Sequence, residues 1–149
     1  MAPAFDEGPQ FAIDKPAGLP CPHLGPDHLC TIHAQLTDKG FPGCATYDCL
    51  GAGQLVTQHL FKGKSWRDHP DLARPMIDAF RAMRDIQDML QLVDMTETLN
   101  LSEDHAVERA RLLAELAPTR WSPEFLVRAE ETDLVGRCRT YLASLQSVV

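Results

Sequence analysis

The feature that most constrains this chain is a group of four cysteines in a segment poor in regular structure. Cys21, Cys30, Cys44 and Cys49 fall within a 29-residue window, whereas Cys138 stands alone in the C-terminal half. In a reducing compartment, thiols clustered in this way are more often metal ligands or redox centres than structural disulfides. The odd total of five also does not fit a fully paired disulfide framework. The N-terminal part is therefore expected to be organised around its sulfur atoms.

The residues around these cysteines favour turns over regular elements. Six of the 11 prolines and three of the nine glycines lie in residues 1–29, where they remove backbone donors and allow tight turns. Two short helices are expected after this arm. The first covers residues 31–39 and ends at Gly40, and the second runs from residue 47 or 48 towards residue 59. A Pro-Gly turn between them is expected to carry Cys44 in a loop.

The second half has the 3.6-residue periodicity of amphipathic helices. Apolar stripes predict a long helix over residues 71–97, a second helix that follows the N-cap Ser102, and a last helix over residues 123–145. Gly136 is the expected weak point of the last helix. Cys138 lies on its apolar stripe and is expected to be a core side chain. No segment alternates over enough residues to require a strand.

These patterns predict a mostly α fold for the 149-residue chain. An irregular Cys-rich segment with short helices, residues 1–66, is expected to pack on a bundle of about three longer helices, residues 67–149. The two parts are expected to form one compact unit.

Charge and hydropathy exclude several kinds of partner. The chain has 14 Lys+Arg against 21 Asp+Glu and a formal net charge of −7, so it lacks the basic field that attracts nucleic acid. No run approaches the roughly 20 apolar residues that cross a bilayer. The N-terminal sequence also lacks the basic start and apolar stretch of a secretory signal. We expect a cytoplasmic protein without a nucleic-acid or membrane partner.

The cysteine spacing limits how a shared site can form. It is not the C-x-x-C pair of a zinc knuckle or a thioredoxin. Cys44 and Cys49 cannot lie on one helix face, so they converge only if Cys44 lies in a loop and Cys49 in the first turn of the helix after it. Cys30 precedes the expected helix at residue 31, where the positive end of the helix dipole lowers a thiol pKa. Four thiolates could close a zinc site or hold an iron-sulfur cluster, and the spacing does not choose between them.

Histidines occupy the same window and could replace a thiolate. His23 follows Cys21 by two residues, His28 lies in the next loop, and His33 follows Cys30 by three residues. Because residues three apart share a helix side, His33 is the best substitute ligand. The alternative for each histidine is a surface or hydrogen-bonded residue with no metal role.

Linked motifs in the first 68 residues resemble a known family. The run PCPHLGPDHLCTIH ends at His33, and GFPGCATYDC ends at Cys49. Both are similar to the back half of the CxxCxxCC zinc/iron-chelating (YkgJ-like) family. With FAIDKPAG from Phe11 and WRD from Trp66, the likeness is closest to cysteine-rich modules that precede pentapeptide repeats in actinobacterial proteins. This resemblance implies metal ligation by the four clustered cysteines.

The sequence departs from that family before Phe11, where the family has a dense cysteine cluster and this chain has none. Half of the family's ligand set is therefore absent. Three explanations remain open: a single four-thiolate site, loss of metal binding with the scaffold kept, or cysteines supplied by another chain. The chain also lacks pentapeptide repeats and has the helical half in their place.

Three hypotheses follow. The first is a metal-binding module that holds zinc, or an iron-sulfur centre, through Cys21, Cys30, Cys44 and Cys49, with His33 as the substitute ligand. The role of this module is structural or sensory. Its helical half meets a protein partner or forms a homodimer. The second is a metal- or thiol-dependent redox enzyme that uses the same window. The third is a metal-free helical interaction protein.

Overall fold

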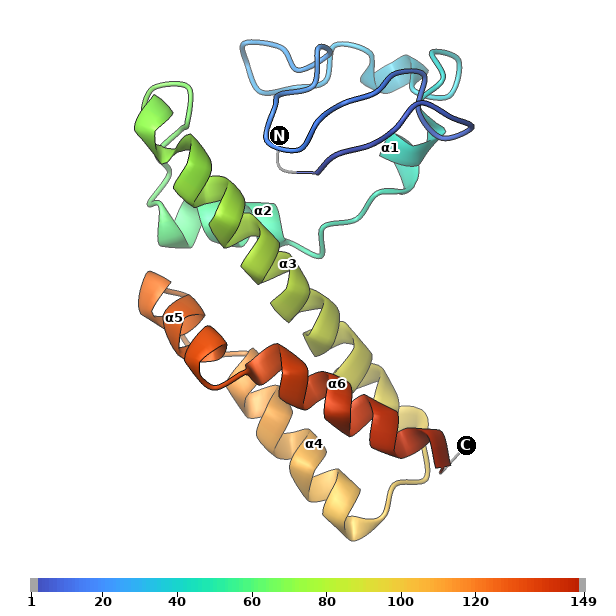
Figure 1. Ribbon diagram of the computed structural model, residues 1–149, viewed down its shortest axis with the longest axis vertical. Coiled ribbons are helices and arrows are strands. Elements are labelled where there is room, and N and C mark those ends of the chain that lie inside the picture. Colours follow the sequence, from blue (N-terminus) through green and yellow to red (C-terminus); the bar gives the residue numbers. More distant parts are fainter. Residues whose placement is uncertain (1–2, 148–149) are drawn as a thin grey trace. The chain divides into compact units, whose positions relative to one another are not determined.

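The computed structural model describes residues 3–147 and divides the chain into two compact units, Met1–Asp48 and Cys49–Val149. Helices are the regular elements of the part described, which contains isolated β-bridges but no β-strand. The longer helices, all in the second unit, pack against one another (Figure 1). The expectation of a mostly α fold is confirmed. None of the helices in residues 3–147 combines the length and apolar character needed to cross a bilayer.

The first unit is made of turns, three isolated bridges and two very short helices. The 3-10 helix η1 covers His33–Gln35, and the α-helix α1 covers Pro42–Thr46. The expected helix over residues 31–39 is thus wrong in extent. Thr31, at its expected start, lies outside η1, and its N–H and its hydroxyl both donate to the His23 carbonyl oxygen, at 2.9 and 3.1 Å. The predicted end at Gly40 is wrong too, because η1 ends at Gln35; Gly40 lies in the following turn with a left-handed φ of 82°.

The second unit begins with a short helical segment formed by α2, Ala52–Gln54, and the π-helix η2, Leu55–Leu60. This helix was expected to begin at residue 47 or 48. It begins at residue 52 because Leu50 and Gly51 both adopt left-handed backbone conformations, with φ of 50° and 78°, which interrupt a right-handed helix.

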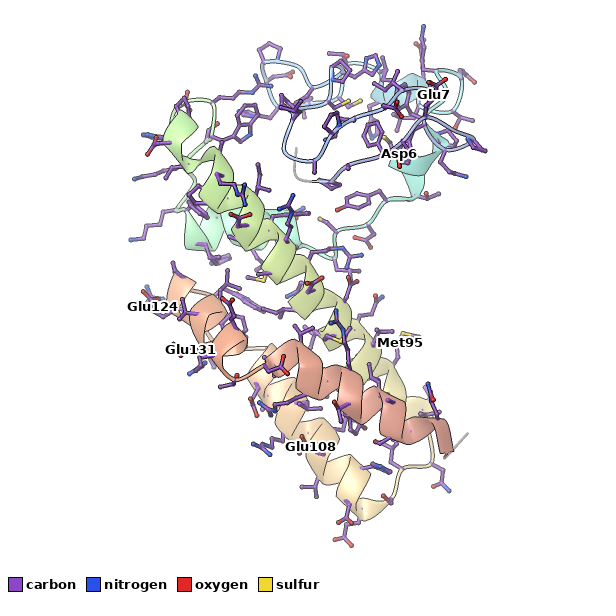
Figure 2. All side chains as sticks on the ribbon, in the orientation of Figure 1. Asp6, Glu7, Met95, Glu108, Glu124 and Glu131 are labelled. Atoms are coloured by element: carbon purple, nitrogen blue, oxygen red, sulfur yellow. The ribbon has the colours of Figure 1, made fainter. Side chains whose placement is uncertain are left out.

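The longest element is α3, Ala73–Met95, flanked by the 3-10 helices η3, Pro70–Leu72, and η4, Thr96–Thr98. These bounds confirm the helix predicted over residues 71–97. The buried residues of α3 are Met76, Ile77, Met83, Ile86, Gln87, Met89 and Val93. They include Met76, Met83, Ile86 and Val93 of the expected apolar stripe, whereas its other members, Ala79, Phe80 and Leu90, are partly buried. Met95, at its C-terminal end, is 62% exposed and projects from the helix (Figure 2).

Three further α-helices complete the second unit: α4, Glu103–Leu116, α5, Pro123–Glu131, and α6, Leu134–Ser144. Ser102 and Ser122 accept hydrogen bonds from the N–H groups of His105 and Phe125, each at 3.3 Å, so both predicted N-caps are confirmed.

The last helix was expected to be continuous over residues 123–145, and this is wrong. It breaks at Thr132 and Asp133, while the predicted weak point, Gly136, lies inside α6. Asp133 has a left-handed φ of 46°. The break lets the buried sides of α5 and α6 join one core, which contains Phe125 and Ala129 from the first helix and Leu134, Cys138 and Tyr141 from the second.

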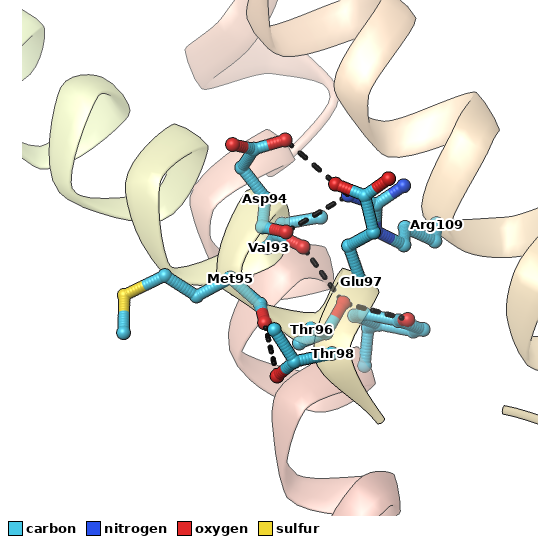
Figure 3. A network of polar contacts seen from close by, with 8 residues as sticks. Val93, Asp94, Met95, Thr96, Glu97, Thr98 and Arg109 are labelled. Atoms are coloured by element: carbon cyan, nitrogen blue, oxygen red, sulfur yellow. Dashed lines mark hydrogen bonds and ion pairs between the residues drawn. The ribbon is translucent and has the colours of Figure 1, made fainter. Parts of the chain in front are cut away.

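Hydrogen bonds and ion pairs connect the C-terminal end of α3 to α4 (Figure 3). The Arg109 guanidinium of α4 donates from Nη2 to the Asp94 carbonyl oxygen at 2.8 Å and to Asp94 Oδ1 at 3.3 Å. Its Nη2 also lies 3.8 Å from Glu97 Oε2. A cation at this position satisfies a terminal carbonyl and complements the negative end of the helix dipole.

Candidate metal centre

Three of the four clustered cysteines lie on separate segments of the first unit. Cys21 opens a turn in which its carbonyl oxygen accepts the Leu24 N–H at 3.0 Å. Cys30 forms an antiparallel bridge with Leu24. Cys44 lies in α1. The chain therefore returns twice to the neighbourhood of Cys21 after passing through turns rich in proline and glycine.

Contacts of His23 and Phe41 connect these segments. The His23 carbonyl oxygen holds Thr31, next to Cys30, and the His23 ring meets the Phe41 ring edge-on at a centroid distance of 5.1 Å. Phe41 is 3% exposed, and its carbonyl oxygen accepts the Cys44 N–H at 3.1 Å. The cysteine-bearing turn and α1 are thereby linked through one buried aromatic residue.

The thiols of Cys21, Cys30 and Cys44 are close enough to influence one another electrostatically. The pKa of Cys44 is raised, first by burial and then by the negative charges of Cys21 and Cys30. All three are free thiols. Because burial and neighbouring negative charge both oppose ionisation of Cys44, its thiolate is disfavoured in the absence of a cation, and a divalent cation would reverse that preference.

A buried lysine brings positive charge to this cluster, and the sequence analysis missed it. Lys15 is 5% exposed, and its ammonium donates to the carbonyl oxygens of Pro16 and Leu19 at 3.0 and 2.8 Å. Its pKa is lowered by desolvation, and the charge of Cys21 opposes that change. Lys15 is the first Lys or Arg of the chain, and the next is Lys39. This isolation was the signal that could have identified it.

His33 and Cys44 share an open hollow of about 650 Å³. Residues 33–38, Cys44, Ala45 and Tyr47 line it. Both His33 and Cys44 are exposed, and the His33 N–H donates to the Cys30 carbonyl oxygen at 3.3 Å. The structure therefore brings the predicted substitute ligand to the same hollow as one of the predicted thiolates.

The fourth predicted ligand, Cys49, belongs to the second unit. Its thiol lies 3.8 Å from Gln54 Oε1 in hydrogen-bonding geometry. The expected placement of Cys44 in a loop and Cys49 in a first helical turn is wrong. Cys44 lies in α1 because Pro42 occupies the first turn of a helix, where its missing N–H costs nothing. Cys49 precedes Gly51, the N-cap residue of α2.

Cys138 lies in the second unit, whereas His23 and His28, the other two histidines of the cysteine window, lie in the first. Cys138 is fully buried in the core of the second unit, as predicted, and burial raises its pKa to about 11. His28 is exposed at a turn with a left-handed φ of 65°. His23 is partly buried and contacts Phe41.

The cysteine sulfur and histidine nitrogen atoms of the first unit are chemically suited to zinc, because thiolate and imidazole are the ligands that zinc prefers. Within residues 3–147, no three His, Cys, Asp or Glu side chains are gathered closely enough to hold a metal ion. The first unit thus has suitable donors in one neighbourhood without a closed coordination shell.

Comparison with known proteins finds one similar protein and no matching family. No protein-family model matches the sequence, and no solved structure matches it. The chain is similar to YybG, an uncharacterized protein of Bacillus subtilis strain 168, with 42% identity over 90 residues. The matched stretch is 60% of this chain and 32% of YybG, so the chain spans about a third of the length of that relative.

Proposed function

We propose that this protein is a cytoplasmic metal-binding module that holds zinc through the thiolates of its N-terminal part. Cys21, Cys30 and Cys44 supply three ligands, and Cys49 or His33 supplies the fourth. An iron-sulfur cluster is the alternative cofactor for the same thiolates. The metal's role is structural or sensory.

The observation that carries this proposal is how little apolar surface the first unit buries. Among its described residues, Phe41 is the one buried hydrophobic side chain, whereas the second unit has two extended clusters. A unit of this size needs a further source of stability, and disulfides or metal ions are the usual ones. The five cysteines are free thiols, and metal ligation by the clustered ones would supply such stability.

The electrostatic surroundings of Cys44 also support metal binding. Burial raises the Cys44 pKa, and repulsion from the neighbouring Cys21 and Cys30 raises it further. A bound divalent cation would remove this repulsion, so part of the binding free energy would appear as folding free energy of the first unit. The shared hollow of His33 and Cys44 gives an imidazole access to the same ion.

The helical second unit is, in this proposal, the part that meets a protein partner or a second copy of the chain. The net charge of −7 argues against a nucleic-acid partner.

Elemental analysis and a visible absorption spectrum of protein purified anaerobically, without added metal or chelator, test the proposal. We expect one zinc per chain and no visible band; iron with sulfide bands would select the cluster. Cys21→Ser, Cys30→Ser and Cys44→Ser should each lower the metal content several-fold. Comparing Cys49→Ser with His33→Asn identifies the fourth ligand. The matched control, Cys138→Ala, should keep full metal content.

Chelation should then unfold residues 1–48 while α3–α6 stay helical, which amide hydrogen exchange resolves segment by segment. Metal-free protein that exchanges and melts identically with and without chelator would overturn the proposal in favour of a metal-free interaction protein. Metal on three ligands with an exchangeable water, or one thiol alkylated far faster than the others, would instead favour an enzyme.

A further inference from the structure

The second unit contains an open groove of about 800 Å³ between η2, α3, α5 and α6. Its floor is apolar, with the buried side chains of Leu60, Ile86 and Ala129 and the partly buried Leu126. Val127 lines it while remaining 55% exposed. A cavity of about 150 Å³ holds one benzene ring, so this groove has room for about five side chains of that size.

The rim of the groove is acidic on both long sides. Asp78 and Asp85 line it from α3, and Glu130 and Asp133 line it from the end of α5 and the turn after it, whereas Arg139 is the one lining cation in the part described. Asp78 is engaged by arginines of its own helix, Arg74 at 2.7 Å and Arg81 at 3.5 Å. The other three carboxylates have no ion pair or side-chain hydrogen bond with the described residues.

Asp133 shows how the backbone keeps one of these carboxylates at the rim. It precedes α6 at the N-cap position, yet its side chain makes no capping hydrogen bond. Its carboxylate instead lies over Gly136, where a Cβ would collide with both oxygens. Because Gly136 also lines the groove, the missing side chain leaves space for the carboxylate there.

Basic groups gather at the other end of α5. The charges of Arg120 and Lys62 act on Glu124, in the first turn of that helix. Neither cation lines the groove. Of the lining carboxylates, Glu130 and Asp133 thus lie at the C-terminal end of α5, and Asp78 and Asp85 lie on α3.

We propose that the groove docks a basic amphipathic helix from a partner protein. The apolar side of such a helix would cover Ile86, Leu126 and Val127, in the manner of a helix laid in a hydrophobic groove. Its flanking lysines or arginines would face Asp85 on one side and Glu130 and Asp133 on the other. A second copy of this chain fits less well, because its net charge of −7 repels an acidic rim.

This inference names the partner surface that the proposed function leaves open. It involves the second unit alone and no metal, so its failure would leave the metal proposal intact, and loss of metal would leave this proposal intact.

The test is binding of a fluorescent Leu/Lys peptide with helical periodicity to the full chain, measured by anisotropy at low and at high salt. A permuted peptide of the same composition is the control for amphipathicity. We expect the periodic peptide to bind roughly tenfold more tightly than the permuted one, with affinity that falls as salt rises.

Two sets of variants locate the binding. The double variant Asp85→Lys/Glu130→Lys reverses charge on both sides of the groove, and Ala82→Trp obstructs it at an exposed lining position. Each should weaken binding of the periodic peptide at least roughly tenfold. The control Glu108→Lys/Glu131→Lys makes the same change in charge at two residues, labelled in Figure 2, that are not among those lining the groove, and it should leave binding unchanged.

Equal binding of both peptides, or equal loss in the groove and control variants, would overturn the proposal. So would sedimentation showing a dimer that only the groove variants dissociate, because the occupant would then be a second copy. Circular dichroism of each variant confirms that lost binding does not reflect unfolding.

Discussion

Arg137 of α6 donates two hydrogen bonds to Glu115 of α4, from Nη1 to Oε2 at 2.8 Å and from Nη2 to Oε1 at 2.7 Å. The two side chains are 28% and 34% exposed, so this ion pair is partly shielded from water. It joins two helices that also share the main hydrophobic core. The hydrogen bonds from Arg137 lower the Glu115 pKa, an effect that burial opposes.

The lowered pKa gives stability a defined pH dependence. Because the folded state holds the ionised carboxylate, its contribution is present above the ordinary glutamate pKa of about 4.3 and is lost as pH falls through the folded-state value. We expect Glu115→Gln to lower the free energy of unfolding by about 1 kcal/mol at pH 7, after allowance for solvent screening. The difference from wild type should disappear in urea titrations well below pH 4. Glu108→Gln, which removes a more exposed pair with Arg111, should cost less, and an equal loss would contradict this assignment.

Gly136 lies inside a helix, where alanine normally stabilises by about 1 kcal/mol. Its Cβ would collide with the carboxylate of the exposed Asp133 side chain, which can relieve the clash by rotating away. We expect Gly136→Ala to stabilise the protein by less than that amount, because the carboxylate must move. Asp133→Gly/Gly136→Ala should recover the full gain, because the double variant removes the carboxylate and suits the left-handed backbone. Gly53→Ala, whose Cβ would have ordinary 3.9 Å contacts, should not destabilise the protein. Thermal unfolding of the four proteins, with Asp133→Gly completing the cycle, gives the coupling, and an additive cycle would refute the clash.

In the first unit, the corresponding close approach is between Gly43 and Phe11. A Cβ on Gly43 would lie 2.5, 2.9 and 3.0 Å from three atoms of the Phe11 ring, which itself stacks on Phe5 at 4.3 Å. Gly43→Ala should therefore displace the ring and cost about 2 kcal/mol. Hydrogen exchange should report the loss in residues 1–48. Gly8→Ala, in open space, is the matched control; similar effects of both variants would argue against a packing role for Phe11.

Cys138 should be the least reactive thiol of the five. It is fully buried, and its pKa of about 11 leaves it protonated near neutral pH. In chelator-treated protein at pH 8, we expect iodoacetamide to modify the exposed Cys44 before Cys138, which should react only at the rate of unfolding, as followed by peptide mass spectrometry. Cys138→Ser should cost about 1–3 kcal/mol, because it buries a hydroxyl in an apolar core. Fast modification of Cys138 in folded protein would contradict its placement.

The helical half could be predicted largely from local signals. Caps at Ser102 and Ser122, and the apolar stripe of residues 71–97, act through neighbours within one or two helical turns, so their information lies in the local sequence. The break at Asp133 could not be predicted in the same way. Both sides of the break are helix-forming, and the left-handed residue is tolerated because it lets α5 and α6 reach one core.

The candidate site was predictable in composition but not in geometry. The cysteine window indicated the candidate donors, and in the structure Cys21 and Cys30 lie within electrostatic reach of Cys44. Cys44 was expected in a loop because Pro-Gly usually marks a turn; a proline can also begin a helix, and here it does. Coordination itself stays a prediction.

By itself, the sequence determined the helical character of the second half, most of its helix starts and the buried position of Cys138, because periodicity and capping are local properties. Tertiary structure alone decided the burial of Lys15, the meeting of His23 with Phe41, and the acidic groove between η2, α3, α5 and α6. Each of these depends on residues far apart in the chain that come together only after folding, when the gain from shared burial outweighs local backbone preferences.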